Sequence, residues 1–269
     1  MSKVKGLITK VTRIYNRYYT MCVQRCCERE FTAENGQTLR YMKFASAKNN
    51  LLLIGFQACS DIGARYNYVS TVRSLGVNRL FIKDDFGADG RGDYYLGENG
   101  TYSVEKAVFE LIDKMIADLK PSKIILFGSS KGAYAALNFG LRYPDSDIVI
   151  AAPQYYLADY LDTERNRGII SDILGGKNSA EECETLNRRL SKIIASDEFA
   201  SKQRVFIHYS NQEHTYHEHI SYMLTDIKQR GIALEEDIGD YKDHDSLKYY
   251  FPGFLTKTVR RIQAEISRQ

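Results

Sequence analysis

The alternation of apolar and polar residues predicts strands separated by helices from residue 49 onward. Apolar runs typical of buried strands occupy residues 49–58, 77–85, 123–130, 147–154, 204–210 and 232–238. Helical periodicity lies between or after them, at residues 63–76, 103–121, from about 131, at 218–231 and after 245. Strands that alternate with helices predict a mostly parallel sheet with helices on both faces, an α/β fold.

Two segments depart from this alternation. Before it, residues 30–44 carry Asn35-Gly36 between alternating stretches, which predicts a two-residue hairpin turn. Within it, residues 155–202 are helical and polar and contain no candidate strand. We expect this second segment to form a helical lid insertion over one end of the sheet.

The N-terminal segment, residues 1–30, predicts a basic amphipathic helix that precedes an α/β-hydrolase domain at 31–269. Apolar residues recur at three- and four-residue spacing, so they share one face; they are Val4, Leu7, Val11, Ile14, Tyr18 and Met21. Lysines and arginines surround this face. Two interpretations stay open, because such a helix can bind an anionic membrane or a capsule-assembly partner, or pack on its own domain.

The composition is ordinary for a globular protein and limits the functional classes. The formal charge of +3 is close to balanced, so nucleic acid is not an expected partner. No apolar run reaches the roughly 18–20 residues of a membrane span, and the odd number of five cysteines is not typical of a disulfide framework. We expect a cytoplasmic location, peripheral at the inner face of the cell membrane if the N-terminal helix binds there.

One short motif indicates chemistry. Gly128-Ser129-Ser130-Lys131-Gly132 matches G-x-S-x-G and lies between a predicted strand and a predicted helix. That context is required of the α/β-hydrolase nucleophile elbow, in which a sharp turn exposes the serine above the sheet. The alternative is a glycine-rich packing corner with an incidental serine. The context favours Ser130 as a nucleophile.

A serine nucleophile needs a base and an acid, which follow it in the order serine, acid, histidine in this fold. His244 lies in the loop between the last strand and the last helix, where the fold places its base. Glu213, three residues after Ser210, is the first candidate acid. Glu218 is a competitor, and the residues that flank His244, Asp243 and Asp245, could orient it only through a local bend.

The oxyanion of an acyl-transfer reaction needs two backbone N–H donors. We expect one from Lys131, directly after the nucleophile, and the other from Gln57, with Phe56 as an alternative. Three neighbouring histidines, His214, His217 and His219, could also suggest a metal site. No H-E-x-x-H motif or paired cysteines accompany them, so we expect loop histidines and no metal.

The segment GSSKGAYAALNFGLRYPDSDIVIAAPQYYLADYL, residues 128–161, resembles the capsular polysaccharide O-acetyltransferases of the serogroup A meningococcal type. More distantly it resembles the α/β-hydrolase acyltransferases of the accessory Sec glycoprotein-export system. The similarity extends to SDIGARYNYV, to RGDYY at 91–95, and to the acid and histidine loops, so it begins near Phe31. The N-terminal helix is additional to the family pattern.

The resemblance implies an α/β-hydrolase fold and transfer of acetyl from acetyl-CoA to a sugar hydroxyl of a capsular or other surface polysaccharide. By matching motif, Ser130 takes the nucleophile's place, His244 the base's, and Glu213 the place of the family's aspartate. No bound cofactor is implied. Two alternatives are a carbohydrate esterase with the same triad, and a non-catalytic scaffold of a glycan-assembly complex.

Overall fold

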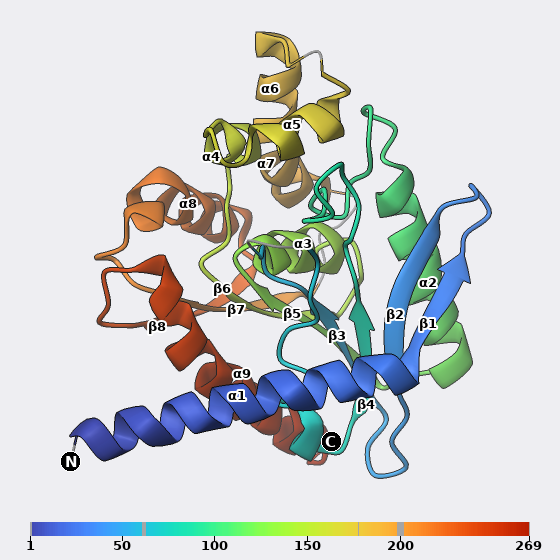
Figure 1. The fold of residues 1–269 in the computed structure, drawn as a ribbon, viewed down its shortest axis with the longest axis vertical. Coiled ribbons are helices and arrows are strands. Elements are labelled where there is room, and N and C mark those ends of the chain that lie inside the picture. Colours follow the sequence, from blue (N-terminus) through green and yellow to red (C-terminus); the bar gives the residue numbers. More distant parts are fainter. Residues whose placement is uncertain (1, 61–62, 177, 198–201, 269) are drawn as a thin grey trace.

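The computed structural model describes residues 2–60, 63–176, 178–197 and 202–268, with side chains described from Ile14 onward. Its centre is an eight-stranded sheet in the order β1-β2-β4-β3-β5-β6-β7-β8 (Figure 1). The strands are β1 Glu28–Thr32, β2 Thr38–Phe44, β3 Leu51–Phe56, β4 Asn78–Ile82, β5 Lys123–Ser129, β6 Asp147–Ala151, β7 Arg204–Tyr209 and β8 Ala233–Ile238. Strand β2 pairs antiparallel with both of its neighbours, β1 and β4. The strands from β4 through β3, β5, β6 and β7 to β8 all pair in parallel. The predicted mostly parallel sheet is confirmed.

The sheet is covered on both faces because its middle strands are apolar on both sides. In β5, the Leu126 side chain points toward helix α3, Lys131–Gly140, where a Cβ on Gly140 would lie 3.5 Å from it. The next residue, Phe127, packs on the other side against Tyr68, whose ring also contacts Phe251 of α9, Leu247–Ile266. Successive residues of a strand point to opposite faces, so α3 and α9 cover opposite faces of the sheet.

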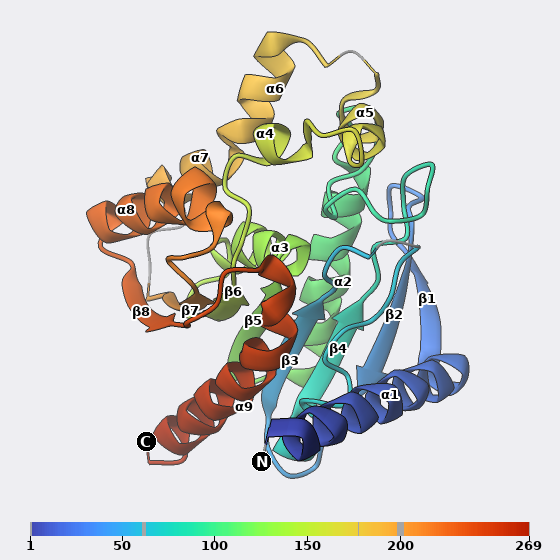
Figure 2. The same cartoon turned by 60° about the vertical axis from the view of Figure 1, so that its left-hand side comes forward.

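The remaining helices lie beside the sheet and beyond its carboxyl end. Helix α2, Ser103–Leu119, packs against β2. Between β6 and β7 the chain forms α4 Leu157–Leu161, α5 Arg167–Leu174, α6 Ala180–Asn187 and α7 Arg189–Ala195, which Figures 1 and 2 show grouped above α3. Helix α8, Ser221–Arg230, contacts α7 and β8. The segment predicted as a lid insertion therefore contains four described helices.

The helix predicted at residues 63–76 is wrong. Residues 64–67 have no regular structure, residues 68–72 form a bend and turns, and a single 3₁₀ turn follows at Arg73–Leu75. Buried Val69 and Val72 produce the helix-like spacing, but Tyr68 has a positive φ of 60° and turns its ring toward Ser129. The aromatic and β-branched residues here have low helix propensity, and tertiary contacts with the sheet determine the conformation instead.

The hairpin between β1 and β2 forms, but its loop is longer than predicted. The strands pair from Glu28↔Met42 to Thr32↔Thr38. Ala33 N–H then donates to Gln37 C=O at 2.9 Å, which leaves three residues to make the turn. Gly36 takes φ 82° there, a conformation that glycine adopts without strain. The Asn-Gly pair thus marks the turn without fixing its length.

Helix α1, Ser2–Cys27, precedes β1 and runs along one side of the molecule with its N-terminal end projecting away (Figures 1 and 2). It packs on the core through Tyr19, Val23 and Cys27. The described members of the predicted apolar stripe, Ile14, Tyr18 and Met21, are exposed; Val4, Leu7 and Val11 lie outside the described side chains. Across the described ranges, no helix has the length and apolarity of a membrane span.

Candidate active site

Ser130 lies at a sharp turn between the end of β5 and the start of α3. Its backbone has φ 53° and ψ −121°, which is rare for a residue with a Cβ. The turn is fixed on both sides, because Ser130 N–H donates to Ala151 C=O at 2.9 Å while Ser130 C=O accepts from Ala133 N–H at 2.8 Å. This strained strand-to-helix geometry is that of a nucleophile elbow.

The two glycines of the motif are required by close backbone approach. A Cβ on Gly128 would lie 2.4 Å from the carbonyl carbon and oxygen of Gly132. A Cβ on Gly132 would in turn lie 2.6 Å from the carbonyl oxygen of Phe56 at the end of β3. Any side chain at either position would push α3 away from the strands and open the turn that holds Ser130.

His244 and Glu213 form a hydrogen-bonded pair from two different loops. Glu213 follows β7 and is fully buried, and its Oε1 accepts from His244 Nδ1 and from Thr215 Oγ1. His244 begins the short turn before α9. Because Nδ1 donates to the carboxylate, Nε2 is the ring atom left to accept a proton. The structure thus brings together the two residues that the sequence proposed as base and acid.

Ser130 and His244 line the same cavity, which has a volume of about 410 Å³. Within the described residues, His244 Nε2 is buried and has no hydrogen-bond partner. Ser130 Oγ instead accepts a hydrogen bond from Gln154 Nε2 at 3.0 Å. In a free enzyme the serine–histidine hydrogen bond is commonly loose and tightens when substrate binds. The cavity therefore holds all three candidate triad residues at its wall or directly behind it.

The candidate oxyanion donors differ in availability. Lys131 N–H is the first amide of α3, and the first amides of a helix have no intrahelical acceptor. Gln57 does not line the cavity, and its N–H donates to the Tyr95 hydroxyl at 2.8 Å. The next amide, Ala58 N–H, lines the cavity and donates to Asn67 Oδ1 at 2.9 Å. A second donor from this turn would have to exchange its present acceptor for the oxyanion.

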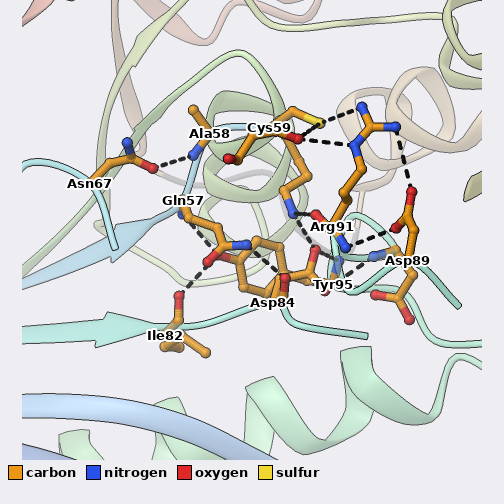
Figure 3. A network of polar contacts seen from close by, with 12 residues as sticks. Gln57, Ala58, Cys59, Asn67, Ile82, Asp84, Asp89, Arg91 and Tyr95 are labelled. Carbon is orange, nitrogen blue, oxygen red and sulfur yellow. Dashed lines mark hydrogen bonds and ion pairs between the residues drawn. The ribbon is translucent and has the colours of Figure 1, made fainter. Parts of the chain in front are cut away.

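The Lys131 side chain joins a buried polar network that includes Asp84 and Arg91, both labelled in Figure 3. Its Nζ lies 2.9 Å from Asp84 Oδ2 and donates to Arg91 C=O at 2.7 Å, with both charged side chains fully buried. Asp93, also buried, faces the same cluster, and burial together with the Asp84 charge raises its pKa well above the ordinary value. The network ties the elbow to the segment that carries Arg91.

Arg91 forms part of the cavity wall and is fixed by several acceptors. Its guanidinium donates to Ser60 C=O at 2.9 Å, to Arg165 C=O at 3.0 Å and to Asn166 Oδ1 at 3.0 Å (Figure 3 shows its approach to Cys59 and Asp89). These bonds join the loop after β3 to the segment between α4 and α5. Arg91 therefore contributes a positive charge to the cavity in a defined position.

Three side chains at the cavity were not identified as functional from the sequence. Gln154 contacts the nucleophile directly, and Tyr160 lines the same cavity as Ser130. Burial raises the pKa of Tyr160 above its ordinary value, so its hydroxyl keeps its proton. The Tyr68 hydroxyl lies 2.6 Å from Ser129 Oγ and so engages the other serine of the motif. Gln154 and Tyr160 lie within the APQYYLADY segment that carries the resemblance, which was the signal available for them.

The three neighbouring histidines line one groove but differ in burial. His219 is buried and its Nδ1 accepts from Tyr156 N–H at 3.2 Å, whereas His214 and His217 are exposed. Across the residues that the structure describes, no group of three or more histidine, cysteine, aspartate or glutamate side chains is arranged to hold a metal ion.

No protein-family model and no curated protein matches the sequence. Among solved structures, the capsule O-acetyltransferase of Neisseria meningitidis serogroup A in complex with caged gadolinium has a TM-score of 0.71 and 25% identity over 86% of this chain and 92% of that chain. A mutant of that enzyme in complex with CoA has a TM-score of 0.70 and 22% identity over 86% of this chain and 94% of that chain.

Two further structures place these similarities in a wider group. The glycosylation-associated Gap123 complex from Streptococcus agalactiae has a TM-score of 0.70 and 18% identity, over 87% of this chain and 46% of that one. The fluorophosphonate-binding serine hydrolase FphF from Staphylococcus aureus has a TM-score of 0.60 and 14% identity, over 84% and 96%. The chain therefore has the α/β-hydrolase fold, and in structure it resembles the capsule O-acetyltransferase of Neisseria meningitidis serogroup A.

Proposed function

We propose that the protein is a serine-dependent O-acetyltransferase that moves acetyl from acetyl-CoA to a hydroxyl of a capsular or other surface polysaccharide. The observation that carries the proposal is Ser130 at a strained elbow in one cavity with His244, whose Nδ1 is held by buried Glu213. Similarity to an acetyltransferase and to serine hydrolases of this fold supports an acyl-transfer or hydrolase role.

In the first half-reaction His244 Nε2 takes the proton of Ser130, whose oxygen attacks the thioester carbonyl. Glu213 keeps the imidazole in the required tautomer and stabilises the imidazolium that forms. Lys131 N–H donates to the oxyanion. Gln57 N–H is the second donor proposed from the sequence, but it would have to leave the Tyr95 hydroxyl and reach a cavity that the next residue, Ala58, lines. The tetrahedral intermediate then collapses, the thiol of CoA leaves with the proton from His244, and Ser130 carries the acetyl ester.

In the second half-reaction a sugar hydroxyl takes the place of the thiol. His244 removes its proton, the sugar oxygen attacks the acetyl ester, and Ser130 leaves with the proton that His244 returns. These steps are the reverse of acylation, with the sugar oxygen in the place of the CoA sulfur. Gln154 Nε2, which donates to Ser130 Oγ, would hold the nucleophile in place between the two steps.

The charges of the cavity support an anionic donor such as acetyl-CoA, which is a substrate here and not a resident cofactor. Arg65, Arg91, Arg165 and Lys248 line the cavity, against one acidic side chain, Asp245. Asp245 pairs with Lys248 at 3.0 Å, whereas within the described residues Arg65 has no carboxylate partner. Arg91 also pairs with Asp89, at 3.5 Å. A lining arginine without a carboxylate partner, such as Arg65, suits the phosphate groups of CoA.

Helix α1 is the proposed contact with an anionic membrane surface or a capsule-assembly complex at the inner face of the cell membrane. The exposed stripe of Ile14, Tyr18 and Met21 supports this proposal, because the helix packs on its own domain through a different set of residues. Lysines and arginines on the same helix would add electrostatic attraction to anionic lipid.

A carbohydrate esterase is the second candidate, since water could take the place of the sugar hydroxyl. The experiment that separates the two is incubation with acetyl-CoA and candidate polysaccharides, followed by measurement of O-acetyl glycan and free acetate. A transferase yields acetylated glycan in excess of acetate, and a carbohydrate esterase yields acetate only when the polysaccharide supplied is already O-acetylated, with or without acetyl-CoA. A non-catalytic scaffold would yield neither.

A further inference from the structure

We propose that the groove between α4 and the segment 214–222 is an acceptor subsite for an uncharged sugar unit. It is lined on one side by Tyr156, Asp159 and Tyr160, and on the other by Glu218, His219 and Tyr222. The inference rests on the proposed function, because the sugar is an acceptor only if the protein transfers acetyl. Binding of the sugar can be tested without any reaction.

The groove adjoins the catalytic cavity. Tyr160 and Asn166 line both spaces. Ser130 lines the catalytic cavity together with these two residues. A sugar in the groove would therefore lie next to the nucleophile, and one of its hydroxyls, or one on the next unit, could reach an acetyl group on Ser130.

The walls of the groove are aromatic and partly exposed. Tyr156 packs against Tyr222 with ring centroids 5.5 Å apart, and against His219 at 6.2 Å. Tyr160 meets the same histidine edge-on at 5.8 Å. The rings hold one another in place, yet Tyr222 remains 51% exposed. Fixed rings with an apolar face and a polar edge can pack on the C–H face of a sugar and hydrogen-bond its hydroxyls.

The charges of the groove select against an anionic ligand. Its described lining includes two carboxylates, Asp159 and Glu218, and neither lysine nor arginine; besides His219, two exposed histidines, His214 and His217, also line it. The catalytic cavity has the opposite character, with four basic residues in its lining. The two substrates of the proposed reaction differ in the same way. The phosphates of CoA fit the basic cavity, and an uncharged sugar, whose hydroxyls can donate to carboxylates, fits the groove.

His219 supplies a neutral donor in this groove. Its Nδ1 accepts from Tyr156 N–H at 3.2 Å, so the ring proton is on Nε2. Burial lowers the pKa of His219 to about 4, which keeps the ring uncharged at neutral pH. A neutral imidazole N–H can donate to a sugar hydroxyl without attracting an anion.

The test measures binding of oligosaccharides to the full-length protein in the absence of acetyl-CoA, by saturation-transfer NMR. The probes are uncharged hexasaccharides of glucose, galactose or N-acetylglucosamine, with an oligosialic acid as the anionic comparison. The variants are Tyr222→Ala, Tyr222→Phe and Tyr156→Ala. Tyr249→Ala is the matched control, because Tyr249 is 52% exposed but does not line the groove. Fluorophosphonate labelling of Ser130 reports in parallel that each variant is folded.

We expect at least one uncharged hexasaccharide to bind the wild type, Tyr222→Phe and Tyr249→Ala, and to bind Tyr222→Ala and Tyr156→Ala about tenfold or more weakly. Where transfer is measured, Tyr222→Ala should raise KM for the glycan without changing labelling of Ser130. The proposal is overturned if no uncharged probe binds, if Tyr222→Ala binds as the wild type does, or if oligosialic acid is preferred. Binding without any acetyl transfer would retain the subsite and refute the acetyltransferase.

Discussion

The Glu213→Gln substitution is the sharpest test of the triad, because it removes a charge while leaving nearly the same shape. Glu213 Oε1 accepts from both His244 Nδ1 and Thr215 Oγ1. Its Oε2 is buried and has no partner among the described residues. The carboxylate therefore acts almost entirely through His244, and a neutral amide in its place cannot stabilise an imidazolium in the same way.

The expected loss can be estimated from the role of the pair. An amide can also present its NH₂ group to Nδ1, which would move the ring proton to Nε2 and leave the histidine unable to accept from serine. Loss of an orienting acid typically lowers kcat by about ten-thousandfold, which corresponds to about 5.5 kcal/mol of transition-state stabilisation. We expect a loss of that order for Glu213→Gln.

The Glu213→Gln substitution should leave the stability of the fold unchanged or increase it. A fully buried carboxylate with one unpartnered oxygen is costly to desolvate, and a neutral isostere removes much of that cost. We therefore expect the melting temperature of Glu213→Gln to equal or exceed that of the wild type. A large loss of activity without loss of stability would identify a catalytic role and exclude a merely structural one.

The assay is the second-order rate of fluorophosphonate labelling, followed by acetyl transfer to glycan, with thermal unfolding of the same samples. Glu218→Gln is the control for the labelling rate only, because Glu218 is the exposed competing acid in the sequence but also lines the proposed acceptor groove. If Glu213→Gln stays within about tenfold of the wild type while Glu218→Gln or Asp243→Asn is inactive, the acid has been misassigned.

Three further predictions concern the nucleophile, a buried histidine and the N-terminal helix. Ser130→Ala should abolish labelling and transfer, by on the order of a millionfold in rate, whereas Ser129→Ala should keep much of both; labelling that survives in Ser130→Ala contradicts the assignment. Burial lowers the pKa of His219 to about 4. Between pH 6.5 and pH 4 the unfolded chain therefore takes up a proton that the folded protein does not. As the pH is lowered through this range, the free energy of unfolding falls by at most about 1.4 kcal/mol per pH unit. Urea unfolding at about pH 7 and about pH 5 should show a weaker pH dependence for His219→Gln, and an unchanged dependence would refute this origin. A protein that begins at Glu30 should acetylate soluble glycan normally but lose salt-sensitive binding to anionic vesicles; an unfolded or inactive product would show that α1 is needed by the domain.

The fold could be predicted from the sequence wherever burial imposed a regular pattern. Strands such as β3 and β5 are buried on both faces and appear as continuous apolar runs. The predicted order of strands and helices is confirmed except at residues 63–76. The loop around Tyr68 was mistaken for a helix because two buried valines three residues apart imitate a helical face. Its true conformation depends on contacts of Tyr68 with Ser129 and Phe127, which no local pattern contains.

The site residues likewise include some that the sequence could predict and some that it could not. Ser130 and His244 could be proposed because the elbow has a local motif and the base has a fixed place in the chain order. Gln154 was missed because its hydrogen bond to Ser130 arises from the parallel pairing of β5 with β6, which brings the two strand ends together. The environment of Gln57 was equally hidden, since the Tyr95 hydroxyl that accepts from its N–H comes from a distant loop.

The measurement that tests the central claim most directly is the mass of the intact protein after mixing with acetyl-CoA, followed by addition of a glycan acceptor. The account predicts one acetyl group on the peptide that contains Ser130, absent in Ser130→Ala, and its transfer to the glycan in preference to release as acetate. An unmodified protein that also forms no acetylated glycan, or an acetyl group that the glycan cannot remove, would contradict it.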